Sequence, residues 1–467
     1  MVLNNQTYKI IITFLSSLFV GYMIFTNNYI VAFILLLGFF YCLLLSWEQK
    51  FIFFSLTVFF PLAFYHLGPI QEFKWIEILA PILCVLFIAE ILDKRQPFFS
   101  KKSFIFFVAI GVLSFLVLIN YIKKPVSGQM LFGASYREAG IRSYYTIFVG
   151  IATFLCSFWF FRYKNLNVRR WLMILLIFSL ALGYLRLIGY FKNFYIPFVE
   201  GVFRYEVAEW HLSFFRIGGL SEVAILGITI LLVLFYKKNW NFISIVLFIS
   251  CLALLFFSGG RAAFFGTMLA IIMYIILINK KYLFHFSFSL LIFLGIYYLL
   301  NLFIPLSNQI NRLIAVKGGF AQQDLYRYST FRYYWEIFLN NPFFGKGIGY
   351  IQNVTIPGNR YGEFISGQLM GGGHGSYLSI LCTFGIGGGF YLVVMLFGSM
   401  YYAYRVFKSN IDVQDNSKLA LFVFLYLIIL SIMFIPGGTG YNSMELWFLS
   451  GVIAGLNSKN EAIDVKS

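Results

Sequence analysis

Long apolar runs recur along nearly the whole chain, and short polar segments separate most of them. Each run holds about 16 to 20 residues, which is enough for a helix to cross, or nearly cross, a hydrocarbon core of roughly 30 Å. This pattern predicts an all-α fold, a polytopic transmembrane helix bundle.

About fourteen of these runs are candidate membrane helices. They cover residues 10–25, 29–46, 51–66, 76–92, 104–122, 144–161, 171–190, 223–236, 242–257, 263–278, 284–303, 377–402, 419–434 and 444–456. The first run lacks the small-residue cleavage site of a signal peptide, so it is expected to remain as the first membrane helix. Pro61 and Pro81 fall inside two runs, and membrane helices tolerate proline better than soluble helices do.

The composition excludes a water-soluble fold. Of the 467 residues, 60% are hydrophobic and 11% are charged, whereas soluble proteins carry about 25% charged residues. The five cysteines fall inside apolar runs, without the spacing of a metal site or a disulfide framework. They are expected to be packing residues: Cys42, Cys84, Cys156, Cys251 and Cys382.

The net charge of +17 is an orientation signal in this context. Lys and Arg gather in alternate loops, at residues 94–102, 162–170, 237–238, 280–281 and 405–418. By the positive-inside rule these loops and both termini are cytoplasmic. The charge therefore does not indicate a nucleic-acid partner.

The opposite face receives the long connections, at residues 121–143, 191–222, 258–262 and 304–376. We expect an N-terminal bundle of about eleven spans over 1–303, a large, partly helical extracytoplasmic loop over 304–376, and C-terminal helices with a cytoplasmic tail over 377–467. Long outer loops of this kind usually carry binding sites or catalytic residues. The 121–143 loop is more positive than an outer loop should be, so either a span is miscounted there or the loop binds an anion.

Two of the outer segments carry an arginine beside paired glycines. Arg216 precedes Gly218 and Gly219, and Ser221 and Glu222 follow just before a span. Ser221 and Glu222 also have a purely structural interpretation: Ser221 would cap the next helix, and Glu222 would be a carboxylate in its first turn. Arg261 ends the short turn over 258–261, where the alternative is an arginine that snorkels to the membrane surface.

Two further outer segments belong to the large loop. Residues 331–339 predict an amphipathic helix with an aromatic face. Arg332 and Glu336 stand four residues apart in it, so the alternative to a functional role is that they simply pair on the helix surface. The glycines over 371–375 place His374 at the head of the next helix. A histidine can accept a proton at working pH.

Three arginines and a base on one outer face suggest an anionic, lipid-linked substrate. Arginine suits pyrophosphate because its planar fork binds two oxygens and keeps its charge. No nucleotide is available outside the cytoplasm, so an activated donor there must carry its leaving group in the membrane. A polyprenyl pyrophosphate sugar is the obvious candidate.

Four motifs in order resemble the O-antigen ligase and O-antigen (repeat-unit) polymerase superfamily. They are R-x-G-G-L-S-E from Arg216, S-G-G-R-A-A from Ser258, R-x-x-W with N-P-F-F-G-K-G-I-G from Arg332, and H-G-S-Y-L-S-I-L-x-x-F-G-I-G-G from His374. The resemblance covers residues 216–388. Family histidines are usually followed by Asn, whereas this chain has Gly375.

The resemblance implies a metal-independent, inverting membrane glycosyltransferase without a cofactor and with a GT-C-like helix arrangement. It implies an undecaprenyl-pyrophosphate-linked glycan as donor and a glycan or glycolipid as acceptor. The protein would lie in the bacterial inner membrane in contact with membrane lipid, with its active site on the periplasmic side. A flippase and a chain-length regulator would be its partners. By position, Arg216, Arg261 and Arg332 correspond to the arginines that handle pyrophosphate, and His374 to the catalytic histidine. Glu222 is the rival base.

Three functions remain open. A repeat-unit polymerase is favoured because Arg216 and Gly227 show the Arg-x10-Gly spacing of such enzymes. A ligase that transfers the glycan to lipid A core or another acceptor is the alternative. The third function is that of a lipid-linked oligosaccharide flippase, which should show internal repeats and charges within its spans. The spans look almost free of charge, with Glu77 near a span end, so the flippase is disfavoured.

Overall fold

The structure is a computed structural model. The described residues are 45–60, 63–67, 70–123, 141–192, 219–236, 241–258, 260–278, 331–332, 334–348, 351–357, 364–370, 376–409, 414–435 and 443–464. The predicted spans at 10–25 and 284–303, and nearly all of the span at 29–46, lie outside them.

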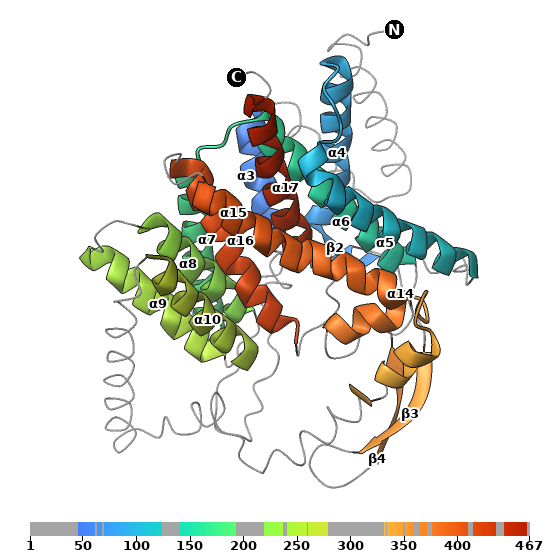
Figure 1. The fold of residues 1–467 in the computed structure, drawn as a ribbon. Coiled ribbons are helices and arrows are strands. Elements are labelled where there is room, and N and C mark those ends of the chain that lie inside the picture. Colours follow the sequence, from blue (N-terminus) through green and yellow to red (C-terminus); the bar gives the residue numbers. More distant parts are fainter. Residues whose placement is uncertain are drawn as a thin grey trace, which may run out of the picture.

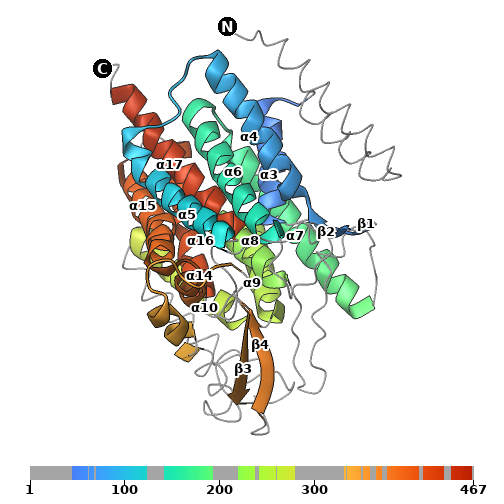
Figure 2. The same ribbon diagram turned by 90° about the vertical axis from the view of Figure 1, so that its right-hand side faces the viewer.

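The described part of the chain is predominantly helical, which confirms the predicted helix bundle (Figures 1 and 2). The helices are α3 (Trp47–Phe59), α4 (Trp75–Asp93), α5 (Phe104–Lys123), α6 (Ile141–Tyr163), α7 (Val168–Lys192), α8 (Leu220–Leu234), α9 (Phe242–Ser258), α10 (Arg261–Ile278), α14 (Ser376–Leu392), α15 (Ser399–Ser409), α16 (Gln414–Met433) and α17 (Met444–Asp464), with a 3-10 turn at Lys101–Ser103 and a π-helical stretch at Val393–Gly398.

Six described helical segments are long and apolar enough to cross a membrane. They are Trp75–Asp93, Lys101–Ile122, Tyr144–Tyr163, Val168–Ile188, Ser376–Ser409 and Asp415–Met433, and three shorter apolar helices cover Leu220–Leu234, Phe242–Ser258 and Arg261–Leu277. These nine segments coincide with predicted spans. The total of about fourteen spans and the GT-C-like arrangement remain predictions.

Two antiparallel hairpins accompany the helices. Strands β1 (Ala63–Leu67) and β2 (Ile70–Lys74) pair before α4, and β3 (Ile351–Pro357) pairs with β4 (Phe364–Met370) in the large loop. Figures 1 and 2 both show β3 and β4 extending away from the helices. The described part of the large loop therefore contains a hairpin, which was not predicted.

The predicted span over 51–66 is wrong in its second half. Helix α3 ends at Phe59, two residues before Pro61, and the chain is extended over Ala63–Leu67. Proline lacks a backbone donor and disfavours helical geometry in the residue before it. Pro81, in contrast, lies inside α4 as predicted.

The core is formed where α17 packs against α6. Gly451 and Gly455 face the backbone of α6, and a Cβ at Gly455 would lie 2.5 Å from the carbonyl oxygen of Phe158. Small residues let membrane helices approach this closely. The fully buried rings of Trp171 and Trp447 fill the adjoining space, and the four described cysteines are buried and free, as expected of packing residues.

The described parts of three basic loops, at residues 94–102, 162–170 and 415–418, meet at one end of the bundle, which we call the basic end. Glu90 pairs there with Lys94 at 2.6 Å and with Lys164 at 2.5 Å. The Asn457 amide donates to the Lys102 carbonyl oxygen at 3.3 Å. The charge pattern therefore correctly predicted that these three loops lie on one face, whereas the loops at 237–238 and 280–281 lie outside the described residues.

Helix packing at Gly455 gives the first testable prediction. Gly455→Ala should destabilise the protein by about 1–3 kcal/mol, because the added Cβ overlaps backbone that cannot move aside cheaply. The thermal midpoint of detergent-solubilised protein measures the change. Gly111→Ala in α5 is the matched control, since no atom lies within 4 Å of its Cβ position; equal midpoints for the two variants would contradict the packing argument.

Candidate functional site

The structure describes three of the five predicted site residues. Glu222, Arg261 and Arg332 lie in described segments, whereas Arg216 and His374 lie outside the described residues. The roles of all five stay predictions. The described three nevertheless show how the motif segments are arranged.

Helix α8 begins differently from the prediction. Gly219 is its N-cap residue, with a left-handed backbone at φ 72°, and no side chain caps the helix. Ser221 instead donates its hydroxyl to the Glu222 carboxylate at 2.9 Å. The alternative that Ser221 caps this helix is therefore wrong, while Glu222 does lie in the first turn. The positive φ explains one glycine of the R-x-G-G motif.

The turn that carries Arg261 lies against the first turn of α8. A Cβ built at Gly260 would lie 3.6 Å from the Cβ of Ser221. The Ser258 hydroxyl accepts a hydrogen bond from the Gly260 amide at 3.2 Å, which fixes the turn. Arg261 then opens α10. Two motif segments about 40 residues apart in sequence are thus neighbours, as the side-by-side packing of α8 and α10 requires.

A third charged residue at this place, Arg186, was missed from the sequence. It lies in α7, is 8% exposed, and its guanidinium occupies the space where a side chain of Gly219 would be. The prediction that the spans are almost free of charge is therefore wrong. An ionisable residue inside an apolar span is by default a candidate functional residue, and that signal was present at position 186 within the span at 171–190.

Acidic groups gather near the same place. The carboxylate of Glu445, in the first turn of α17, interacts electrostatically with Glu222 and with Lys74. Its oxygen accepts a hydrogen bond from the Ser443 hydroxyl at 2.9 Å. Glu222 thus interacts with both Arg186 and Glu445, and the turn that carries Arg261 lies next to it. We call Arg186, Glu222, Arg261 and Glu445 the site cluster. Glu445 was not predicted, because its position follows from helix packing.

The site cluster and the basic end lie at opposite ends of the bundle. Helix α7 connects them, since Arg169 lies at its start and Arg186 near its end. The separation along the helix is about 26 Å at a rise of 1.5 Å per residue. This agrees with the predicted separation of the basic loops from the candidate site.

The predicted amphipathic helix of the large loop is confirmed. Residues 331–332 and 334–340 are helical, and we call them the loop helix. Tyr334 and Ile337 are buried against Leu378 and Cys382 of α14, and the Cys382 thiol donates to the Tyr334 carbonyl oxygen at 2.8 Å. The loop helix is thereby fixed to α14.

Arg332 lies on the exposed face of the loop helix. Its Nε donates to a Glu336 carboxylate oxygen at 3.0 Å, and the two side chains are 70% and 52% exposed. The alternative of surface pairing is thus present in the structure. An exposed pair of this kind contributes little to stability.

Two of the motifs interlock through their backbones. Helix α14 is broken at Gly385, where φ is 64° and ψ is −153°. The Lys346 amide donates to the Cys382 carbonyl oxygen at 2.7 Å, the Gly347 amide to the Thr383 carbonyl oxygen at 3.1 Å, and the Ile386 amide to the Pro342 carbonyl oxygen at 2.7 Å. Residues 342–347 therefore satisfy the polar groups that the break exposes, as a low-dielectric surrounding requires.

Glycine is needed on both sides of this interlock. A Cβ at Gly385 would collide with the backbone of Pro342 and Phe343, and one at Gly345 with the backbone of Thr383. Both glycines also have φ near 64°, which disfavours any other residue. The motifs N-P-F-F-G-K-G and F-G-I-G-G are thus two halves of one structural unit that holds the loop helix close to the start of α14.

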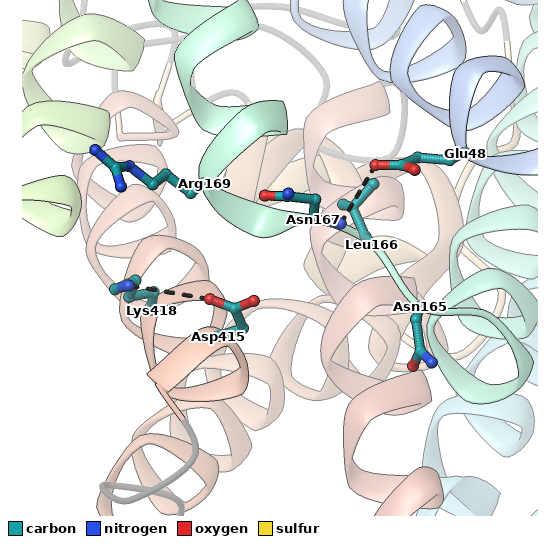
Figure 3. Close-up of a pocket in the computed structure, with 7 residues that line it drawn as sticks. All are labelled: Glu48, Asn165, Leu166, Asn167, Arg169, Asp415 and Lys418. Carbon is teal, nitrogen blue, oxygen red and sulfur yellow. Dashed lines mark hydrogen bonds and ion pairs between the residues drawn. The ribbon is translucent and has the colours of Figure 1, made fainter.

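A hollow of about 540 Å³ lies at the basic end and is separate from the site cluster (Figure 3). Glu48, Asn165, Leu166, Asn167, Arg169, Asp415 and Lys418 line it. The Glu48 carboxylate accepts from the Asn167 amide at 3.4 Å, and Lys418 pairs with Asp415 at 3.9 Å. It contains no predicted site residue, and its charges are partly paired internally. Among the described residues, no group of three or more His, Cys, Asp or Glu could hold a metal ion.

A comparison with protein families supports the predicted relationship. Residues 245–393 match the family model described as O-antigen ligase. This segment contains Arg261, Arg332, His374 and the interlock, whereas Glu222 and Arg216 precede it. The resemblance to the O-antigen ligase and polymerase superfamily is thereby confirmed. No curated protein matches the chain.

The interlock predicts a specific change in backbone protection. Gly385→Ala should speed hydrogen exchange over residues 342–348, because the added methyl group displaces the backbone that donates and accepts there. Hydrogen-exchange mass spectrometry measures it, with Gly398→Ala as control, since its Cβ position has no atom closer than 3.9 Å. Unchanged protection in Gly385→Ala would contradict the interlock.

Proposed function

We propose that this multi-pass membrane protein moves a glycan from an undecaprenyl-pyrophosphate donor to an acceptor sugar in surface polysaccharide assembly, as a repeat-unit polymerase. The family match supports a glycosyltransferase of the O-antigen ligase and polymerase type in the inner membrane. The observation that carries the proposal is the arrangement of Arg261, Glu222 and Arg186 in one cluster at the end of the bundle opposite the basic loops.

The position of the cluster supports a periplasmic site. The positive-inside rule places the basic end in the cytoplasm, so the site cluster faces the other side and both predicted termini remain cytoplasmic. Nucleotide sugars are confined to the cytoplasm. A donor anchored in the lipid by its diphosphate leaving group meets this requirement, and the arginines supply the charge that such a leaving group needs.

The proposed mechanism is a single inverting displacement. The acceptor hydroxyl oxygen attacks the anomeric carbon, the bond from that carbon to the diphosphate oxygen breaks, and the bonding electrons leave with undecaprenyl diphosphate. Arg216, Arg261 and Arg332 neutralise the charge that develops on the diphosphate, a role for preorganised cations. His374 accepts the proton of the hydroxyl, with Glu222 as the rival base. No metal and no cofactor enter these steps.

The ligase remains the alternative, and one observation favours it. Gly227, which completes the Arg-x10-Gly spacing, packs against α9: a Cβ there would lie 2.7 Å from the Cys251 sulfur. Helix packing alone explains this glycine, and the matched family model is described as O-antigen ligase. We keep the polymerase as the proposal because of the Arg-x10-Gly spacing from Arg216. The ligase, which would transfer the glycan to lipid A core or another acceptor, is the competing function.

The glycan pattern of cells that lack the protein decides between these functions. A polymerase deletion leaves single repeat units on the final acceptor, whereas a ligase deletion leaves long lipid-linked chains. A flippase and a chain-length regulator are the partners expected to act on the same lipid-linked glycan. If this chain were itself a flippase, its deletion would leave the lipid-linked units on the cytoplasmic side. That outcome would contradict glycosyl transfer by this chain.

Replacement of the two candidate bases identifies the proton acceptor. His374→Ala should lower the transfer rate by about 10²- to 10⁴-fold, the usual contribution of a general base, while the protein remains folded in the membrane. Glu222→Gln should retain most activity. Transfer from a lipid-linked donor in proteoliposomes measures both, and the opposite ranking would assign the role of base to Glu222.

A further inference from the structure

Arg186 is a buried cation that has no direct partner among the residues that the structure describes. Its side chain is 8% exposed and its Nε is buried without a hydrogen-bond partner. Among the described residues, none forms an ion pair with it within 4.0 Å, although Glu222 interacts with it electrostatically over a longer distance. A charge held inside a membrane helix is costly unless an opposite charge compensates it.

The guanidinium lies beside the start of a helix that has no side-chain cap. Its Cζ, Nη1 and Nη2 atoms surround the position that a Cβ of Gly219 would take, and Gly219 is the N-cap residue of the 15-residue helix α8. The first amides of a helix have no partner within it, and the helix dipole favours an anion there. Arg186 and the start of α8 thus present donors to the same place.

The turn that carries a second arginine lies near the same helix start. The Gly260 turn contacts Ser221, and Arg261 follows it directly. Arg186 of α7 and the Arg261 turn therefore both lie close to the start of α8. Glu222 extends from this turn, is exposed, and accepts a hydrogen bond from Ser221.

We propose that Arg186 and the N-terminus of α8 form a binding site for one phosphate group of the lipid-linked diphosphate donor, in addition to the predicted arginines. This inference rests on the proposed function and adds a residue that its motifs do not contain. The guanidinium fork binds two phosphate oxygens, and the α8 amides bind a third as helix N-termini do. The phosphate is a closer counter-ion for Arg186 than the Glu222 carboxylate is.

The test uses inorganic pyrophosphate as the probe on purified full-length protein in detergent. Pyrophosphate should raise the melting temperature of the wild type, and Arg186→Met should weaken the apparent affinity at least about tenfold, as loss of one partner in a buried charge pair does. Arg186→Lys should fall between them, because it keeps the charge without the fork. Arg170→Met is the matched control, since Arg170 is exposed at the basic end.

The outcomes separate this inference from the proposed function. If Arg186→Met binds pyrophosphate as the wild type does while Arg261→Lys binds it weakly, the Arg186 site is overturned and the proposed function stands. If the wild type neither binds pyrophosphate nor transfers glycan, the proposed function fails as well. If Arg186→Met does not fold, the lysine variant decides: weaker binding than wild type supports the site, and equal binding overturns it.

Discussion

Every polar group inside a bilayer has to find its partner within the protein, because the hydrocarbon offers none. The break of α14 at Gly385 exposes backbone groups, and residues 342–347 supply their partners. This one backbone interlock holds the large loop against the membrane helices. It also places the loop helix, with Arg332 on its exposed face, beside the start of α14.

The same constraint explains the charged cluster at the other side of the bundle core. Arg186 lies within an apolar helix, where its charge is sustained only by nearby opposite charge. Glu222 lies close enough to interact with both Arg186 and Glu445. Gly219 makes this arrangement possible, since it leaves room for the guanidinium of Arg186. The packing of α17 on α6 through Gly451 and Gly455 brings the start of α17, and with it Glu445, to this place.

Sequence patterns predicted the parts of this structure that depend on local signals. Hydropathy located the described membrane helices, and the spacing of aromatic residues over 331–339 predicted the loop helix and its Arg332 pair. Local signals failed where tertiary contacts decide. The start of α8 is fixed by the backbone of Gly219 rather than by Ser221, and Pro61 lies beyond the end of α3 although the apolar run continues through it.

The charged residues of the site cluster were only partly predictable for the same reason. Arg261 and Glu222 belong to recognisable motifs, whereas Arg186 is one residue in an apolar run and Glu445 follows a loop. Their common location follows from how α7, α8, α10 and α17 pack, which no spacing within one segment reveals. The two interlocking glycine motifs were visible in sequence, but their contact with each other was not.

The central claim is that the site cluster faces the periplasm while the basic end faces the cytoplasm. Labelling of single cysteines with a membrane-impermeant maleimide tests it most directly, in a chain whose native cysteines are replaced. Positions 222 and 167 suit the test because both are exposed, at opposite ends of the bundle. The account predicts that a cysteine at 222, but not one at 167, reacts in intact spheroplasts. Reaction at 167 with protection of 222 would contradict it.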